Sequence, residues 1–302
     1  MKARVLKAGG TWNVVQTSVG DIVKTRLKGK LRLQNFESNN PIAVGDWVEL
    51  SREKDDWLIK FIYERENSIE RQSTKIGKQV QILAANIDQV VIIMSLKNPK
   101  SSLGFLDRIL VSAESSQVKA CILFNKIDLL SKNEIEQAYY CEEAYQKLGY
   151  TCRLISLKEK NGIIEISKIV RGKLSLLIGN SGVGKSTLVN SLDERKNRLV
   201  GKISEANSKG KHTTTLAELL FLENNNTMII DAPGIKEFGL YSIKPDKLRW
   251  TFPEFLPYQK KCKFSDCMHK NEPHCEVKLA VAEKKIQLRR YNYYLELLNE
   301  LQ

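Results

Sequence analysis

The chain has 302 residues, of which 42% are hydrophobic and 27% charged, as in ordinary globular proteins, and its length suits two or three domains. No apolar run reaches the ~18–20 residues that span a bilayer, and Met1–Leu6 lacks the features of a signal peptide, so we expect a cytoplasmic protein without a membrane partner. The net charge of +13 is spread along the chain. Such an excess suits contact with a polyphosphate, although many cytoplasmic proteins are mildly basic without binding RNA.

Residues 1–68 are predicted to form a small β-barrel. Short apolar segments alternate there with glycine-, asparagine- and proline-containing breaks: Val14-Val15, Ile22-Val23, Leu31–Leu33, Trp47–Leu50 and Trp57–Lys60. Several short strands at near-regular spacing are typical of a barrel, and we predict an OB-fold that binds RNA. An SH3-like barrel remains the alternative, because periodicity does not separate the two.

Residues 69–240 have a different character, because apolar runs alternate with helical patterns. The predicted strands are Val90–Met94, Ala120–Phe124, Cys152–Ile155, Leu174–Ile178, Leu216–Leu222 and Thr227–Ile230. The predicted helices between them are 103–115, 134–148, 163–170 and 185–192. Buried strands that alternate with helices predict a mostly parallel sheet covered on both faces, and hence a multidomain α/β protein.

The first motif in chain order, directly after a predicted strand, is Asn125-Lys126-Ile127-Asp128. A carboxylate at the Watson–Crick edge of a base accepts from N1–H and the 2-amino group of guanine, and adenine offers neither donor. We assign this role to Asp128, with the stem of Lys126 along the base plane and Asn125 linking this loop to the phosphate loop. Ser156 and the amide of Leu157, at the end of the next strand, are expected to complete the guanine pocket.

The second motif is a phosphate-binding loop, Gly179-Asn180-Ser181-Gly182-Val183-Gly184-Lys185-Ser186-Thr187. A buried strand leads into it and a helix leads out, which is the context that G-x-x-x-x-G-K-S needs. Its glycines let backbone amides wrap a phosphate closely, and the helix N-terminus adds a favourable dipole. We expect Lys185 to reach the β- and γ-phosphates and Ser186 to ligate Mg²⁺.

The third motif, at the end of the last predicted strand, is Asp231-Ala232-Pro233-Gly234. Asp231 is expected to hold Mg²⁺ through water, and the amide of Gly234 to bond the γ-phosphate. A threonine within Gly210–Thr215, taken to be Thr214, is expected to close on both, although the sequence leaves open which threonine does so. Ras-like GTPases carry the phosphate loop first and the base motif near the end, so this order predicts a circularly permuted Ras-like domain.

The catalytic group needs a separate assignment. Ras-type enzymes keep a water-orienting glutamine after the third motif, whereas this chain has Ile235, which neither accepts nor donates a hydrogen bond. We therefore expect slow intrinsic hydrolysis of GTP that needs a partner. His212 is the candidate replacement, acting beside Lys185 and Thr214, and a loop histidine that faces solvent is the equally weighted alternative.

Residues 241–302 are predicted to hold one zinc ion in a knuckle, followed by helices. The candidate ligands, three thiolates and one imidazole, are Cys262, Cys267, His269 and Cys275. A closed set of four ligands indicates a structural site. His274 is an alternative imidazole, but its place beside Cys275 makes joint ligation awkward. Arg289–Tyr294 mixes cations and aromatics, which can stack on RNA bases or pack against the preceding domain, and we favour packing.

A barrel, a permuted GTPase and a Cys-Cys-His-Cys knuckle in one chain closely resemble the small-ribosomal-subunit-dependent, circularly permuted GTPases of bacteria (the RsgA type). The resemblance covers essentially the whole chain and includes Asn86–Gln89, Leu106–Arg108, Gly210–Thr215 and Phe252–Phe255. It implies an N-terminal OB-fold, the small ribosomal subunit and its 16S rRNA as partners, and a late role in maturing that subunit. It also implies GTP hydrolysis stimulated by the subunit, and we expect a monomer. Ala232 and Leu157 replace the family's common threonine and alanine, but neither side chain takes part in the chemistry above.

Two further hypotheses follow from this order of motifs. Because Asp231–Gly239 leads directly into the zinc-binding part, nucleotide state is expected to reposition that part against the barrel, so that GTP favours binding to the subunit and hydrolysis favours release. The competing function is an RNA-binding module that only senses guanine nucleotides, with incidental catalysis. A zinc-dependent DNA-binding regulator ranks far behind, because it leaves the GTPase motifs unexplained.

Overall fold

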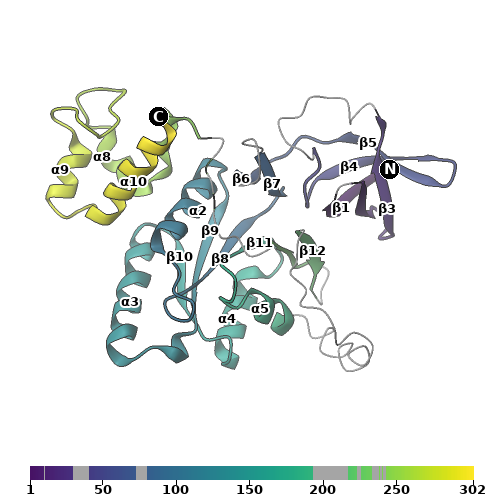
Figure 1. The fold of residues 1–302 in the computed structure, drawn as a ribbon, viewed down its shortest axis with the longest axis horizontal. Helices are drawn as coiled ribbons and strands as arrows, with labels where there is room; N and C mark the ends of the chain where they lie inside the picture. The colour runs from purple at the N-terminus through teal and green to yellow at the C-terminus, as the bar shows by residue number, and fades with distance from the viewer. Residues whose placement is uncertain are drawn as a thin grey trace.

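The computed structural model shows three parts that follow one another across the molecule: a β-barrel at the N-terminus, a sheet with helices in the middle, and a helical part at the C-terminus (Figure 1). The described residues are 1–9, 11–29, 41–72, 80–192, 217–222, 226–232, 238, 240 and 243–302. The predicted strand at Leu31–Leu33 lies outside them. No helix in the described ranges is long and apolar enough to cross a membrane.

Within the residues that the structure describes, the N-terminal part is a barrel of five strands. They are β1 (Lys2–Gly9), β2 (Trp12–Thr17), β3 (Ile22–Leu27), β4 (Trp47–Glu53) and β5 (Asp56–Ile62). Their order is β1-β2-β3-β5-β4, with β4 returning to β1 and β3 parallel to β5. This closed order is that of an OB-fold, so the predicted barrel is confirmed and the SH3-like alternative is wrong. Val5, Val15 and Val48 fill its core, because a strand points alternate side chains to the same face.

A hairpin of β6 (Ser68–Gln72) and β7 (Val80–Ala85) follows the barrel. It approaches the barrel at Gly45, whose φ of +94° lies in the left-handed region that favours glycine. A Cβ at this position would lie 2.1 Å from the carbonyl oxygen of Ala85, and the amide of Ala85 donates to the carbonyl of Val44 at 2.9 Å. This contact between the two backbones therefore requires glycine.

The middle part is an α/β domain, and its described ranges form a sheet of six strands. They are β8 (Gln89–Ser95), β9 (Lys119–Asn125), β10 (Thr151–Leu154), β11 (Leu174–Ile178), β12 (Glu218–Phe221) and β13 (Met228–Asp231). Their spatial order is β10-β9-β8-β11-β13-β12, and neighbours are parallel except for β12 against β13. The chain enters this sheet at β8, beside the strand β11 that leads into the phosphate loop. A permuted chain order thus fills an intact α/β sheet.

Helices cover both faces of this sheet (Figure 1). They are α2 (Leu103–Ser115), α3 (Lys132–Lys147), α4 (Lys160–Val170) and α5 (Lys185–Leu192), with a short 3-10 turn η1 (Ile127–Leu129). Val90 and Ile92 of β8 share a core with α2 and α3, whereas Val91 and Ile93 share one with α4 and α5. Alternation along the strand therefore builds both layers, and the predicted two-sided parallel sheet is confirmed.

The C-terminal part is helical. Its elements are α7 (Pro245–Leu248), the 3-10 turns η2 (Arg249–Thr251) and η3 (Pro253–Phe255), α8 (Leu256–Gln259), α9 (Glu276–Ala282) and α10 (Leu288–Leu301). The rings of Phe252, Phe255 and Tyr294 pack together with centroids 5.0 to 5.3 Å apart. These rings belong to the same hydrophobic core as α2, so the C-terminal part packs on the α/β domain.

The barrel meets the α/β domain edge to edge. β1 pairs with β12 at Lys7 and Glu218, so that barrel and domain form one sheet of eleven strands. The ammonium of Lys7 and the carboxylate of Glu218 are exposed and lie 2.7 Å apart. Arg4, also on β1, donates to the carbonyl of Asn86 at 3.1 Å. Leu6 of β1 and Val44 also belong to the large hydrophobic core of the α/β domain, so backbone pairing, polar contacts and buried apolar side chains together make this junction.

Candidate functional site

The predicted phosphate loop lies between β11 and α5, at the carboxyl edge of the sheet where α/β folds bind ligands. Gly182 and Gly184 have φ values of +79° and +113°, which glycine adopts without strain. A Cβ on Gly179 would lie 2.4 Å from the carbonyl oxygen of Ile93, so the loop passes tightly over β8. The glycines of the motif are thus needed by the backbone itself.

Lys185 folds back against this loop. Its ammonium donates to the carbonyls of Gly179 and Asn180 at 2.6 and 2.9 Å. Burial lowers the pKa of this ammonium, and the charge of Asp231 opposes the shift. Ser186, the predicted Mg²⁺ ligand, is exposed at the start of α5. A phosphate wrapped by the loop would accept hydrogen bonds from the same ammonium.

Asn125 links the base loop to the phosphate loop. Its side-chain amide donates to the carbonyl of Val183 at 2.8 Å, and its side-chain oxygen accepts from the amide of Leu157 at 3.1 Å. A Cβ on Gly184 would lie only 2.5 Å from the amide nitrogen of Asn125. One buried side chain therefore joins the base loop, the phosphate loop and the loop after β10.

Asp128 presents its carboxylate beside two donors. The hydroxyl of Ser156 donates to Oδ1 at 2.8 Å, and the ammonium of Lys158 lies 2.8 Å from Oδ2. Hydrogen bonding from Lys158, and then from Ser156, holds the pKa of Asp128 below its usual range, so the group is an ionised acceptor at neutral pH. Sequence reasoning missed Lys158; the available signal was its place directly after Ser156 and Leu157.

A further loop contacts both nucleotide loops. Lys126, with φ of +68°, donates to the backbone carbonyl of Asn98 between β8 and α2. Pro99 lies 3.6 Å from where a Cβ on Gly182 would stand. Asn98 and Pro99 therefore lie beside the base loop and the phosphate loop. No sequence motif marks this role, because Asn98 contributes a backbone group.

The third motif is described in part. The predicted residues that lie outside the described ranges are His212, Thr214, Gly234 and Ile235. Asp231 ends β13 in register with Leu177 of β11, and Ala232 is buried. Because β11 leads into the phosphate loop, Asp231 stands at the same edge of the sheet as that loop.

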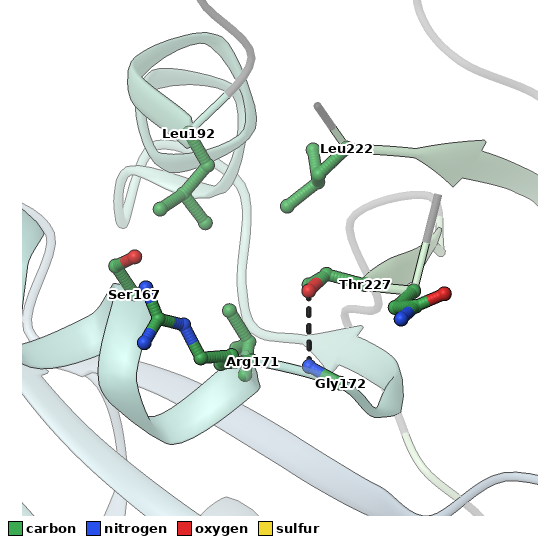
Figure 2. A pocket seen from close by; sticks show the side chains of 8 residues that line it. Ser167, Arg171, Gly172, Leu192, Leu222 and Thr227 are labelled. Atoms are coloured by element: carbon green, nitrogen blue, oxygen red, sulfur yellow. Dashed lines mark hydrogen bonds between the residues drawn. The ribbon is translucent and has the colours of Figure 1, made fainter. Parts of the chain in front are cut away.

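A hollow of about 330 Å³ lies elsewhere on the α/β domain, between Arg171, Leu192, Leu222 and Thr227 (Figure 2). There the amide of Gly172 donates to the hydroxyl of Thr227 at 3.0 Å. Gly172 precedes β11 and Thr227 precedes β13, whereas the phosphate loop follows β11. The hollow is therefore at the opposite edge of the sheet from the nucleotide loops.

The four predicted metal ligands converge in one cluster. The ligand atoms of Cys262, Cys267, His269 and Cys275 all lie within 4.8 Å of one another. Nδ1 of His269 is 3.7 Å from Sγ of Cys262 and 3.4 Å from Sγ of Cys275, and these two sulfurs are 4.0 Å apart. Ligands about 2.1–2.3 Å from a tetrahedral ion are separated by roughly 3.4–3.8 Å, so the donor set fits Zn²⁺. His274 is exposed and stands outside the cluster.

The chemistry of these donors also favours a cation. Burial raises the pKa of Cys267 to about 12 and also raises that of Cys275, so thiolates here need a positive charge between them. Burial, assisted by the charge of Arg249, lowers the pKa of His269 to about 4, which keeps the imidazole in its neutral ligating form. This Cys₃His cluster therefore indicates metal binding.

Two other groups hold the backbone of this cluster. Arg249 in η2 donates to the carbonyl of Cys267 at 2.7 Å. The hydroxyl of Tyr291 on α10 donates to the carbonyl of His269 at 2.7 Å. Hydrogen bonds therefore connect the metal cluster to both η2 and α10.

A permuted phosphate-loop domain, carried between an OB-fold and a Cys₃His centre, defines this protein as a circularly permuted GTPase. Residues 2–57 match the RsgA N-terminal domain, and residues 62–241 match the RsgA GTPase domain. The chain therefore belongs to the RsgA family of small ribosomal subunit biogenesis GTPases, and it is a GTP hydrolase.

The similarity extends over more than nine tenths of each relative. The chain is 42% identical to the small ribosomal subunit biogenesis GTPase RsgA of Flavobacterium johnsoniae, covering 99% of this chain and 93% of the relative. It is 40% identical to the RsgA of Christiangramia forsetii, covering 99% and 96%. Among solved structures, YjeQ from Thermotoga maritima matches with a TM-score of 0.77, 31% identity and 99% and 98% coverage. YloQ, a circularly permuted GTPase, matches with a TM-score of 0.72, 27% identity and 99% and 94% coverage.

Proposed function

We propose that the protein acts in the cytoplasm as a monomer, binds the small ribosomal subunit, assists a late step of its maturation, and is released when it hydrolyses GTP there. What carries this proposal is the set of linked nucleotide loops between an OB-fold and a metal-binding part, shared along the whole chain with relatives named for small-subunit biogenesis. The net charge of +13 supports contact with 16S rRNA, because neutralised phosphates contribute most to non-specific nucleic-acid binding.

The proposed nucleotide ligands are Asn125, Lys126, Ile127, Asp128, Ser156, Leu157, Gly179 through Thr187, Asp231 and Gly234. Asp128 reads the guanine edge, and Asn125 keeps the base loop and the phosphate loop in register. Lys185 contacts the β- and γ-phosphates. The proposed Mg²⁺ ligands are Ser186, Thr214 and Asp231. Bound Mg²⁺ supplies positive charge that neutralises the phosphates.

We propose Zn²⁺ as the structural metal, one ion per chain, held by Cys262, Cys267, His269 and Cys275. The spacing of the donors and the burial of the thiols support this choice. Elemental analysis of purified protein should find one zinc per chain. A preparation that folds fully without metal would disprove a structural role.

The proposed function can be tested through the stimulation of GTP hydrolysis by the small ribosomal subunit. The side chain of Ile235 supplies no hydrogen bond to an attacking water, so the chain alone should turn over GTP slowly, with His212 as the candidate group that a partner orders. GTP turnover should be measured alone, with small ribosomal subunits, and with large ones. We expect a large rise with the small subunit only, and its loss in Lys185→Ala.

The competing sensor function predicts a different pattern. A guanine-sensing RNA-binding module would keep its RNA function in Lys185→Ala, because turnover would be incidental. Fast turnover by the chain alone, unchanged by ribosomes, would mean that it carries its own complete catalytic group and serves another partner.

A further inference from the structure

A cluster of charges lies buried between α2 and α10. Asp107 of α2 has no exposed surface. Its carboxylate accepts from Arg290 of α10 at 2.9 Å, from the neighbouring Arg289, and from the hydroxyl of Tyr145 on α3 at 2.8 Å. Arg290 is only 1% exposed, so this ion pair is removed from water. The prediction that Arg289–Tyr294 packs against the preceding domain is confirmed by these contacts.

A second carboxylate balances this cluster. Glu254 of η3 accepts from two nitrogens of Arg290 at 2.7 and 3.1 Å. The same guanidinium lies 4.8 Å from the ring centroid of Phe252. Two carboxylates thus meet two guanidinium groups from α2, η3 and α10. Such an arrangement fixes one register, because a displaced helix would leave a buried charge without its partner.

The helix α2, which carries Asp107, also leads back to the nucleotide site. α2 begins at Leu103, separated by two residues from the loop of residues 97–100, which lies beside the base loop and the phosphate loop. That loop is fixed to β8, because Ser101 and Ser95 exchange hydrogen bonds of 2.7 and 3.1 Å. Asp107 stands about one helical turn into α2, a distance of roughly 6 Å along a stiff rod. One rigid helix therefore connects the loop beside the nucleotide site to the charge cluster.

We propose that the cluster of Asp107, Glu254, Arg289 and Arg290 makes the metal-binding part and the nucleotide loops a single rigid body. Exchange of GDP for GTP then leaves the metal-binding part in place relative to the α/β domain. This replaces the expectation from chain continuity, in which the segment after the third motif swings the metal-binding part. Asp107 and Arg290 act as positioning residues for the metal-binding part, through contacts that include no ligand of nucleotide or metal.

Spin labels on the full, zinc-loaded chain test this proposal. Labels carried by an unnatural amino acid avoid the natural cysteines, and Leu279 on α9 and Ile164 on α4 are exposed positions. Pulsed electron resonance would compare their distance distribution with Mg²⁺–GDP and with a non-hydrolysable GTP analogue. We expect the same mean and width in both states. A mean that shifts with the nucleotide would overturn the proposal.

Variants of the charge cluster test whether the cluster fixes the distance between the two labelled positions. Arg290→Met should broaden the distribution in both nucleotide states, with zinc content and GDP binding retained. The matched control is Arg108→Met, which breaks a partly exposed pair between the same two helices, Arg108 with Glu300, and should leave the width unchanged. An unchanged width in Arg290→Met would also refute the proposal.

Hydrogen exchange of the unaltered chain serves where Arg290→Met fails to fold. Amides of α10 and α2 should exchange as one unit, with equal dependence on denaturant. Opening of α10 at lower free energy than α2 would show two separate bodies and contradict the proposal.

Discussion

The two ends of the molecule are attached to the central α/β domain by different means. The C-terminal part shares a hydrophobic core with α2 through residues such as Phe252 and Tyr294, and it adds the buried pair of Asp107 with Arg290. The barrel instead has a core cluster of its own and adds Leu6 and Val44 to the buried core of the α/β domain; it also contacts the domain through the β1–β12 edge and approaches the β6–β7 hairpin closely at Gly45. One end is joined by many buried side chains and a buried ion pair, and the other by backbone contacts with few buried side chains.

This difference determines how far the loss of structure caused by a local substitution should extend. Shared cores and buried charges make two segments lose structure together, because neither is satisfied without the other. An edge pairing of strands transmits much less, since most of each strand's partners lie on its own side. Damage at the metal-binding end should therefore weaken the α/β domain, whereas damage at the barrel joint should act mainly on the barrel and the adjoining β6–β7 hairpin.

The largest effect is expected from loss of the metal. His269→Ala removes a proposed ligand, and structural zinc contributes about 10–16 kcal/mol in zinc-finger peptides, so most folding of residues 260–275 should be lost. Hydrogen exchange should show lost protection in α10 and α2, with the barrel unchanged. His274→Ala is the matched control, because His274 is exposed and outside the cluster. Equal zinc content and thermal stability in the two variants would mean that His269 is not needed to hold the metal, and would contradict this prediction.

Arg290→Met should follow in size. It leaves the carboxylates of Asp107 and Glu254 buried without their cation, which typically lowers the free energy of unfolding by about 3–5 kcal/mol. Arg108→Met removes a partly exposed bidentate pair with Glu300 and a hydrogen bond to Tyr293, and because water reaches these groups it should cost less, about 1–2 kcal/mol. Urea unfolding of both variants measures the difference. Similar small losses would mean that apolar packing alone attaches the C-terminal part.

Local chemistry made much of this molecule predictable from its sequence. The phosphate loop needs glycine where φ is positive, at Gly182 and Gly184, and the motif carries glycine there. The apolar runs predicted the parallel strands, because strands buried on both faces have little polar alternation. The four zinc-ligand candidates lie within fourteen residues, so their convergence required only a short turn.

The attachment of the ends was not predictable, because it depends on contacts between distant residues. Asp107 and Arg290 are separated by 183 positions, and no local pattern pairs them. Chain continuity suggested a moving metal-binding part, since Asp231–Gly239 runs directly into it. Reasoning from chain order gives no information on the contact between α2 and α10. Asn98 was missed for a related reason, since a backbone carbonyl has no sequence signature.

A substitution at the barrel joint should have an intermediate effect. Gly45→Ala adds a Cβ 2.1 Å from the carbonyl of Ala85 at a φ of +94°, and a cost of about 2–4 kcal/mol is expected from clash and backbone strain together. Gly20→Ala is the matched control, with a φ of +97° but no atom within 4 Å, so strain alone should cost about 1–2 kcal/mol. Hydrogen exchange should place the added loss in the barrel and the β6–β7 hairpin. Loss of protection in α10 would contradict the difference between the two ends.

The smallest effect is expected at the ion pair across the β1–β12 edge. Lys7 and Glu218 are 48% and 38% exposed, so water screens their charges and a double-mutant cycle with Lys7→Ala and Glu218→Ala should give a coupling of about 0.2–1 kcal/mol. The coupling should shrink in high salt, because exposed charges are screened over roughly 8–10 Å near physiological ionic strength. A coupling several times larger and independent of salt would mean that charge holds the barrel as firmly as it holds the C-terminal part. The two ends would then be equally rigid, and movement of the barrel would require breaking that pair rather than bending the edge of a sheet.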